Sequence, residues 1–245
     1  MQGNKLPRMR IGTDDFKTLL LNSDIFVDKS LMIKELLEDS GEVILITRPR
    51  RWGKSLNMNM LQKFFEVEID EVGTVLSEEI KVNHKLFIGG EVDLGFGEYK
   101  DLKPLKIATI ASAMNRQGQF PVILLNLKDV KGSSYKEIEK GVEKQVVKLF
   151  INHRYLKKYY VVSDNDLLDG IQKKQLERYY TGEFTLEDIK DALRFLSELL
   201  FKHFNQKVYI LIDEYDTPIN GAYIKLGANL KEFEKVLELF RGMLG

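Results

Sequence analysis

The sequence contains no cysteine among its 245 residues, which excludes disulfides and thiolate metal sites and fits a reducing cytoplasm. No apolar run approaches the roughly 20 residues that span a bilayer. The polar first ten residues, MQGNKLPRMR, are not typical of a secretory signal. Lysine plus arginine and aspartate plus glutamate each total 37, so no overall field draws the chain to nucleic acid or anionic lipid. We therefore expect a cytoplasmic protein without a membrane partner.

Hydrophobic residues make up 44% of the chain, which is enough for a core. The length predicts one large domain, or one domain with an appendage, and we expect a single domain over 1–245. Three apolar runs that do not alternate are typical of buried parallel strands: 42–47 (EVILIT), 121–127 (PVILLNL) and 208–212 (VYILI). Helical patterns lie at 31–38, 56–65, 135–150, 186–204 and 233–240, with another helix start at Pro218. Strands that alternate with long helices predict a layered α/β fold with a parallel sheet.

Three further local expectations concern a segment, a helix start and a histidine. The stretch 66–118 contains the glycine-rich run IGGEVDLGFGEYKDL, and we expect it to be a loop-rich insertion on the surface. Thr185, with Asp188 three residues later, is a capping-box signal for the helix at 186–204. His203 lies near the end of that helix and is expected to be a solvated or capping residue rather than a metal ligand.

The stretch ITRPRRWGKSLN, residues 46–57, has the features of a phosphate-binding loop. A strand would deliver the chain, Gly53 would let the backbone approach a phosphate, and a helix beginning near Lys54 would direct its N–H groups and dipole at the anion. Lys54 would reach the β- and γ-phosphates, and the Ser55 hydroxyl would ligate Mg²⁺. The rest of the candidate nucleotide-binding set is Arg50, Arg51, Trp52 and Leu56.

The front of this loop departs from the glycine-led pattern. Arg48 stands where a glycine would open the loop, and Pro49 removes one backbone donor. The guanidinium groups of Arg50 and Arg51 suit phosphate oxygens and would compensate. The alternative is a basic turn that happens to contain Gly-Lys-Ser. The strand before it and the amphipathic helix after it favour a binding site.

A second feature is VYILIDEYD, residues 208–216. Carboxylates at the carboxyl end of a buried strand lie where open α/β sheets bind ligands. Asp213 would hold the Mg²⁺ shell, directly or through water, and Glu214 would orient and deprotonate an attacking water. Two acids after a strand are as typical of a solvated turn. Together with the loop, however, they supply both halves of a nucleotide site.

These residues resemble a known family. The segments IGTDDFKTLL, FVDKSLMIKELLE and VILITRPRRWGKSLNMNML are similar to the bacterial AAA-ATPase-like family, a module that usually precedes a PD-(D/E)XK nuclease-like domain. That family's loop reads Thr-Arg-Pro-Arg-Arg, an aromatic residue and Gly-Lys-Thr or Gly-Lys-Ser, as at 47–55 here. Its Leu-Ile-Asp-Glu-Tyr-Asp motif stands at 211–216, and FPVILLNLKDV matches the intervening strand. The resemblance covers most of the chain and is weakest at 66–118.

The resemblance implies a P-loop NTPase fold of three layers. Its mostly parallel sheet has helices on both faces and is of the additional-strand, catalytic-glutamate type. It implies ATP and Mg²⁺ as ligands, with Lys54 and Glu214 as catalytic residues and Ser55 and Asp213 at the metal. The family's Phe/Tyr-Val-Asp-Lys signature stands at 26–29. We expect that segment either to wrap the adenine or to form a structural turn capped by Asp28.

In that fold a further strand, carrying a polar sensor residue, follows the second motif and lies between the two motif strands in the sheet. The sequence ends after a helical pattern without such a strand or a nuclease-like domain. We therefore expect a fragment, a truncated product or a chain completed by a partner. The alternative is that the two motif strands pair directly, in an altered order.

Three functions are open at this point. The first is ATP hydrolysis, with Arg194 and Arg241 as arginine-finger candidates by elimination. The second is a switch that binds ATP without turnover and orders the loop for a protein partner or for self-association. The third is nucleic-acid binding through Arg48, Arg50 and Arg51. It is disfavoured because one basic patch in a neutral chain makes few phosphate contacts, unless a linked nuclease-like domain supplies more.

Overall fold

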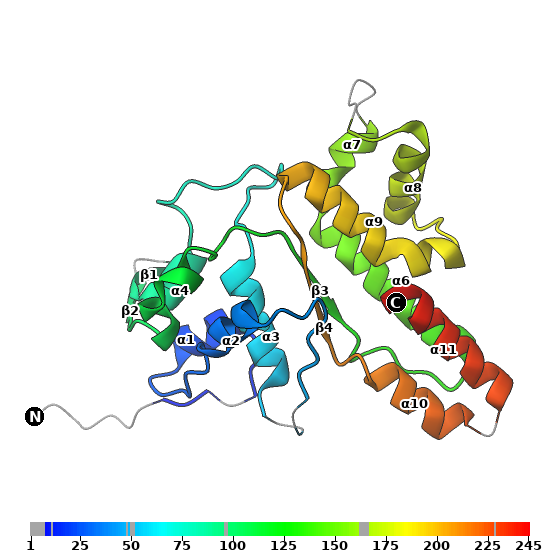
Figure 1. Cartoon of the computed structure of the whole chain (residues 1–245), viewed down its shortest axis with the longest axis horizontal. Helices are drawn as coiled ribbons and strands as arrows, with labels where there is room; N and C mark the ends of the chain where they lie inside the picture. The colour runs from blue at the N-terminus through cyan, green and yellow to red at the C-terminus, as the bar shows by residue number, and fades with distance from the viewer. Residues whose placement is uncertain are drawn as a thin grey trace, which may run out of the picture. The chain divides into compact units, whose positions relative to one another are not determined.

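The computed structural model describes residues 8–10, 12–47, 49, 52–95, 98–161, 167–227 and 229–245. The chain divides into two compact units, which are described separately. Unit 1 comprises Met1–Asp70 and Val75–Phe120, and unit 2 comprises Glu71–Thr74 and Pro121–Gly245. Both units contain helices and a small two-stranded sheet, so the architecture is mixed α/β (Figure 1). The expected single P-loop domain over 1–245 stays a prediction.

Unit 1 is built from short helices and one hairpin. Its helices are α1 (Phe16–Asn22), α2 (Met32–Glu38), α3 (Lys54–Phe65), α4 (Asn83–Ile88), the 3-10 helix η1 (Lys106–Thr109) and α5 (Ala111–Met114). Strands β1 (Gly90–Gly95) and β2 (Glu98–Leu102) pair antiparallel, with Gly90 opposite Leu102. The helices expected at 31–38 and 56–65 are confirmed as α2 and α3.

Aromatic rings from three helices form the centre of unit 1. Phe87 of α4 stacks on Phe16 of α1, with ring centroids 5.6 Å apart, and meets the edge of Phe64 of α3 at 5.1 Å. Such pairs are favourable beyond the area that they bury. Because α4 supplies one of these rings, the segment 66–118 contributes to the core.

The expectation that 66–118 is a loop-rich surface insertion is therefore wrong. Leu86, Phe87 and Ile107 are fully buried, and the segment contains α4, both strands and η1. Its glycines suggested a loop, but Gly89 serves close packing. It has a φ of +81°, and a Cβ there would lie 2.6 Å from the carbonyl oxygen of Leu102. Glycine is the residue that permits both the dihedral and the approach.

The strand expected at 42–47 is absent from the structure, which corrects the sequence reading. These residues are described, but they form no strand, and no other described strand pairs with them. The side chain of Val43 is 91% exposed and that of Leu45 is 65% exposed. A strand needs a neighbour to accept and donate its backbone hydrogen bonds. Apolar composition indicates a tendency to be buried, but it does not supply that neighbour.

Unit 2 contains two parallel strands and a group of long helices. Its elements are β3 (Val122–Asn126), α6 (Tyr135–Asn152), η2 (Arg154–Lys157), α7 (Lys158–Val161), α8 (Gly170–Thr181), α9 (Leu186–Phe204), β4 (Tyr209–Asp213), α10 (Thr217–Leu226) and α11 (Leu230–Leu244). The strands expected at 121–127 and 208–212 are confirmed as β3 and β4, and their pairing is parallel. The helices expected at 135–150, 186–204 and 233–240, and the start near Pro218, are confirmed as well.

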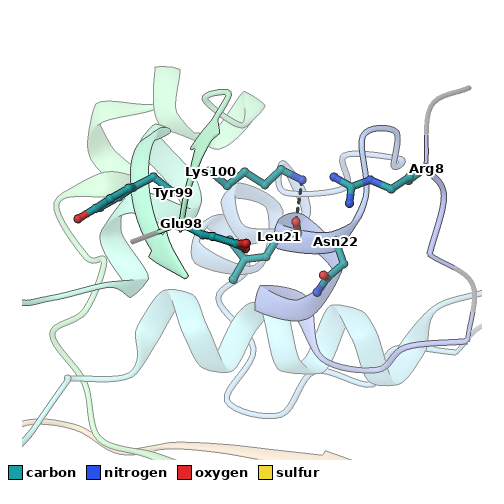
Figure 2. Close-up of a pocket in the computed structure, with 6 residues that line it drawn as sticks. All are labelled: Arg8, Leu21, Asn22, Glu98, Tyr99 and Lys100. Carbon is teal, nitrogen blue, oxygen red and sulfur yellow. Dashed lines mark hydrogen bonds between the residues drawn. The ribbon is translucent and has the colours of Figure 1, made fainter. Parts of the chain in front are cut away.

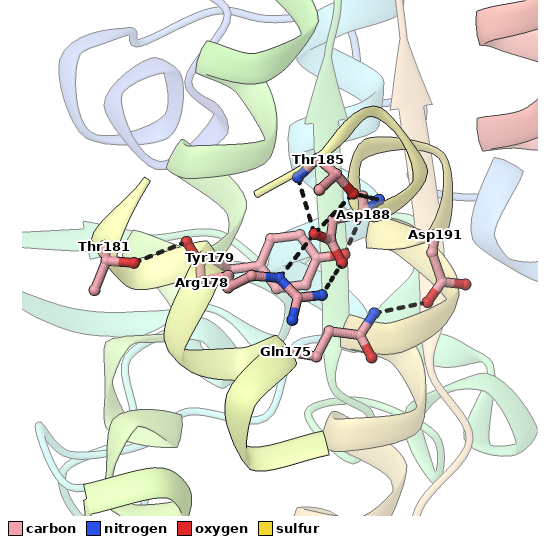
Figure 3. A network of polar contacts seen from close by, with 7 residues as sticks. All are labelled: Gln175, Arg178, Tyr179, Thr181, Thr185, Asp188 and Asp191. Atoms are coloured by element: carbon pink, nitrogen blue, oxygen red, sulfur yellow. Dashed lines mark hydrogen bonds and ion pairs between the residues drawn. The ribbon is translucent and has the colours of Figure 1, made fainter. Parts of the chain in front are cut away.

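Helix α9 is held by a polar network at its first turn (Figure 3). The expected capping box is present: Thr185 accepts from the Asp188 amide, and Asp188 accepts from the Thr185 amide at 2.9 Å. Asp188, whose side chain is 5% exposed, also accepts from Arg178 of α8 at 2.5 and 2.9 Å. Beneath it, Tyr179 stacks on Phe150 of α6 with ring centroids 4.0 Å apart. The network thus joins α8 to α9 above an aromatic core.

The short segment Glu71–Thr74 packs on the helices of unit 2. The carbonyl oxygen of Gly73 contacts His203 Nε2 at 2.8 Å, and Lys158 donates to the carbonyl of Val72 at 2.9 Å. His203 is half-buried and also bonds the Tyr159 hydroxyl through Nδ1, so it is neither the solvated nor the capping residue that we expected. Burial lowers the pKa of His203, although the bond to Gly73 opposes this. Neutral imidazole with its proton on Nε2 satisfies both partners.

Candidate functional site

The candidate phosphate-binding turn lies at the N-terminus of α3, in unit 1. Gly53 is the N-cap residue and is left-handed, with φ of 76° and ψ of 30°. An N-cap residue is usually extended and caps the helix with its side chain. Glycine has no side chain, so the first N–H groups of α3 receive no such cap from it. The helix start near Lys54 is confirmed, and its free N–H groups favour an anion.

Space is available at this turn. Among the described residues other than its two chain neighbours, no atom lies within 4 Å of a Cβ built on Gly53. Lys54, Ser55 and Leu56 are half-buried at the start of α3, and Trp52 is 58% exposed. Arg50 and Arg51, expected to contact phosphate, lie outside the described residues, as does Arg48.

A lysine that sequence reasoning did not assign to the loop also lies at this turn. The ammonium group of Lys29 donates to the carbonyl oxygen of Trp52 at 3.0 Å. The only signal for it in the sequence was the family's four-residue signature at 26–29. Of the two roles weighed for that signature, the turn capped by Asp28 is confirmed, because Asp28 accepts from the amides of Ser30 and Lys106, both at 2.8 Å.

A hollow in unit 1 beside Arg8 is not a candidate ligand site. It has a volume of about 400 Å³ and is lined by Arg8, Leu21, Asn22, Glu98, Tyr99 and Lys100 (Figure 2). Its central cation is already engaged, since Lys100 donates to the carbonyls of Leu21 and Ser23 at 2.9 and 2.8 Å. Burial lowers the pKa of Lys100, although nearby Asp24 opposes this. We interpret these contacts as joining β2 to the end of α1.

The acidic pair lies at the carboxyl end of β4, in unit 2. The parallel register places Asp213 beside Asn126, the last residue of β3. Asp213 is 5% exposed, and its two carboxylate oxygens accept from the Asn126 side-chain amide at 3.2 Å and the Glu214 backbone amide at 3.1 Å. A carboxylate has about four lone-pair positions, so acceptor capacity remains for a cation or a water.

Glu214 has an unusual backbone conformation. Its φ is 55°, and Asn205 is the only other non-glycine residue with positive φ in the described part of the chain. Such a conformation costs roughly 1–2 kcal/mol for an ordinary side chain. Strained residues gather at functional sites, where surrounding contacts hold them. Here Thr217 at the start of α10 donates its hydroxyl to the Glu214 carboxylate at 2.8 Å, which directs the side chain.

Asn126 and Thr217 therefore belong to the acidic group at the carboxyl end of β4, and sequence reasoning did not single them out. A signal for Asn126 was present: it is the polar residue at the end of an otherwise apolar strand, where α/β sheets bind ligands. Thr217 had only the weak signal of a hydroxyl before Pro218. Arg194 is paired with Asp191 and Glu198 along α9, both at 2.6 Å, and Arg241 is exposed on α11.

Each unit contains an oxygen donor of the kind that a nucleotide-bound Mg²⁺ takes. The described ranges contain no group of three or more His, Cys, Asp or Glu side chains that would hold a metal by themselves. Mg²⁺ bound with a nucleotide takes only one or two protein oxygens, the remainder coming from phosphates and water. A hydroxyl such as Ser55 and a carboxylate with free lone pairs such as Asp213 are donors of that kind.

No described helix is long and apolar enough to cross a membrane.

One of three comparisons with known proteins identifies a family. A search of curated proteins and a search of solved structures find no match. A family model described as predicted AAA-ATPase matches residues 10–85 and 97–244, which include Gly53, Lys54 and Ser55 as well as Asp213 and Glu214. Because this match spans most of the sequence, the chain belongs to the AAA-ATPase-like family, a membership consistent with nucleotide binding.

Proposed function

We propose that the chain binds ATP with Mg²⁺ and hydrolyses it to ADP and phosphate. The observation that carries the proposal is the start of α3, where a left-handed glycine with open space around it precedes Lys54 and Ser55. A backbone of this kind lets phosphate oxygens approach the first amides of a helix. Family membership supports ATP as the nucleotide.

Lys54 carries the charge at the phosphate end. Its ammonium group would neutralise the β- and γ-phosphates, and the N–H groups at the start of α3 would fix their orientation. Ser55 would offer its hydroxyl to Mg²⁺, which when bound offsets negative charge on the phosphates. Arg50, Arg51, Trp52 and Leu56 complete the proposed nucleotide contacts.

Asp213 and Glu214 are proposed as the acidic residues of the reaction. Asp213, held by Asn126, would contribute to the Mg²⁺ shell. Glu214 would orient a water and accept its proton as the water attacks the γ-phosphorus. The hydrogen bond from Thr217 leaves the second carboxylate oxygen of Glu214 for that water.

The proposed fold is the three-layer P-loop architecture of additional-strand, catalytic-glutamate type. It is supported by the parallel pairing of β3 with β4, because that architecture has a strand beside the one that ends in the acidic pair. It is also supported by the helix that follows Gly53 and by family membership.

Replacing Lys54 with alanine tests the binding site. We expect ATP affinity, measured by equilibrium dialysis with labelled ATP, to fall at least tenfold. A tenfold change corresponds to about 1.4 kcal/mol, and losing a charged phosphate contact costs more than this. Lys34→Ala is the matched control, because Lys34 lies on α2 of the same unit and its described ion pair is with Glu38 at the surface. Native affinity in Lys54→Ala would refute the assignment of the site.

A second variant separates hydrolysis from the alternative, a switch that binds ATP without turnover. Glu214→Gln keeps an oxygen that accepts from Thr217 but cannot take a proton from water. We expect this variant to bind ATP as the native chain does and to release no phosphate. Tight ATP binding by the native chain with no phosphate release would favour the switch.

A further inference from the structure

The bond between Lys29 and the loop has a geometric consequence. Lys29 donates to the carbonyl of Trp52 at 3.0 Å, and that carbonyl belongs to the peptide group joining Trp52 to Gly53. The described chain contains no cis peptide. In a trans peptide the C=O and the N–H point in opposite directions. Lys29 therefore holds one side of the peptide and turns the amide of Gly53 to the other side.

The backbone on both sides of Lys29 is itself fixed. Asp28 accepts from the amides of Ser30 and Lys106, and the Ser30 hydroxyl oxygen accepts from the amide of Ile107 at 3.1 Å in the buried interior. Burial acts to raise the pKa of Asp28, but the backbone hydrogen bonds outweigh it and hold that pKa below its usual range. The carboxylate is thus ionised at neutral pH and accepts both amides.

Lys29 thereby connects a fixed turn to an exposed one. Ser30 and Ile107 are fully buried, whereas Trp52 is 58% exposed. The described contacts of the Trp52–Gly53 peptide include one side-chain bond, and it comes from Lys29. A charged donor suits this role, because hydrogen bonds from charged groups are stronger than those between neutral groups.

We propose that Lys29 is a positioning residue of the nucleotide site, which orients the Gly53 amide toward the β- and γ-phosphates of ATP from behind the loop. This inference rests on the proposed function of the Gly53–Ser55 turn. Lys29 acts through the peptide group that it holds and does not contact the nucleotide. It therefore favours nucleotides with a β-phosphate and makes no difference to the binding of AMP.

The experiment compares ATP and AMP binding to Lys29→Met and Lys29→Arg by equilibrium dialysis in the presence of Mg²⁺. Methionine keeps the length of the side chain without a donor, whereas arginine keeps a cationic donor. We expect ATP affinity to fall roughly tenfold in Lys29→Met, the loss of one charge-assisted bond. AMP affinity should stay native in that variant, and arginine should restore most of the ATP affinity.

Lys85→Met is the control, because Lys85 also lies exposed in unit 1 and donates to a backbone carbonyl, that of Glu91 at 3.2 Å. It should bind both nucleotides as the native chain does. Equal losses for ATP and AMP in Lys29→Met would overturn the inference, and so would native ATP affinity. Lys54→Ala, measured alongside, separates the two ideas: if it loses ATP while Lys29→Met does not, the function stands and the role of Lys29 is wrong.

Discussion

Replacing Gly53 with alanine separates the conformational role of this glycine from its role in binding. The native φ of 76° lies in the left-handed region that glycine adopts without strain. A methyl group there meets no atom within 4 Å among the described residues beyond its chain neighbours, so these residues add no steric term to the dihedral cost. The change in stability is therefore a backbone effect, whereas any change in ATP affinity comes from the space that the methyl group fills.

The magnitude follows from two opposing terms. Placing alanine in the left-handed region costs roughly 1–2 kcal/mol. Alanine also restricts the unfolded chain, which returns about 0.4–1 kcal/mol. We therefore expect Gly53→Ala to lower the free energy of unfolding by about 1 kcal/mol. ATP affinity should fall by more than tenfold, because the added Cβ stands where a phosphate would approach the backbone.

Urea denaturation and equilibrium dialysis with ATP measure the two effects. Gly182→Ala is the control: Gly182 ends α8 with a φ of 81°, and a Cβ there also meets nothing within 4 Å. It should lose similar stability and keep native ATP affinity. The reasoning is refuted if Gly53→Ala binds ATP like the native chain, because the open space at α3 would then not be used by the nucleotide.

Three further predictions concern unit 2. Asp188→Asn should lower the free energy of unfolding at pH 7 by about 1–3 kcal/mol, by removing the charge that accepts from Arg178. Hydrogen bonds from Arg178 and Thr185 outweigh burial and lower the pKa of Asp188 in the folded chain. Its contribution to the free energy of unfolding is therefore present above the unfolded pKa and is lost as the pH falls. In urea denaturation the difference in stability between the native chain and Asp188→Asn should narrow below about pH 4. Asn126→Leu should cost about 1 kcal/mol in the same assay, since it leaves buried Asp213 without one donor. Gly73→Ala should lower the free energy of unfolding by about 3 kcal/mol, because Gly73 has a φ of 85° and a Cβ there would lie only 2.5 Å from the Tyr155 ring. An unchanged melting temperature would contradict that packing.

Much of the helical structure was predictable from local signals. Helix α9 begins and ends at the residues that its pattern predicts, because Thr185 and Asp188 cap it and its apolar residues repeat at helical spacing. Strands β3 and β4 were predictable from apolar runs that do not alternate. These features depend on residues close in sequence, and so they can be recognised there.

The errors concern elements that depend on distant neighbours. The run at 42–47 contains four consecutive apolar residues, as β3 does, yet it forms no strand among the described residues, because strand formation requires a hydrogen-bonding partner. For the segment 66–118, the prediction missed contacts that the structure contains. Its glycines suggested a loop, but Gly89 allows a helix and a hairpin to approach closely, which only tertiary packing reveals.

For the candidate site, the sequence by itself determined the residue types: a glycine, lysine and serine at one helix start, and two acids after a strand. Only the tertiary structure decided the left-handed backbone of Glu214, the pairing of Asn126 with Asp213, and the contact of Lys29 with the Trp52 carbonyl. The physical reason is that a sequence motif specifies which functional groups are present but not how they are oriented. Their orientation depends on hydrogen bonds between residues 23 or 87 positions apart, which no local pattern contains.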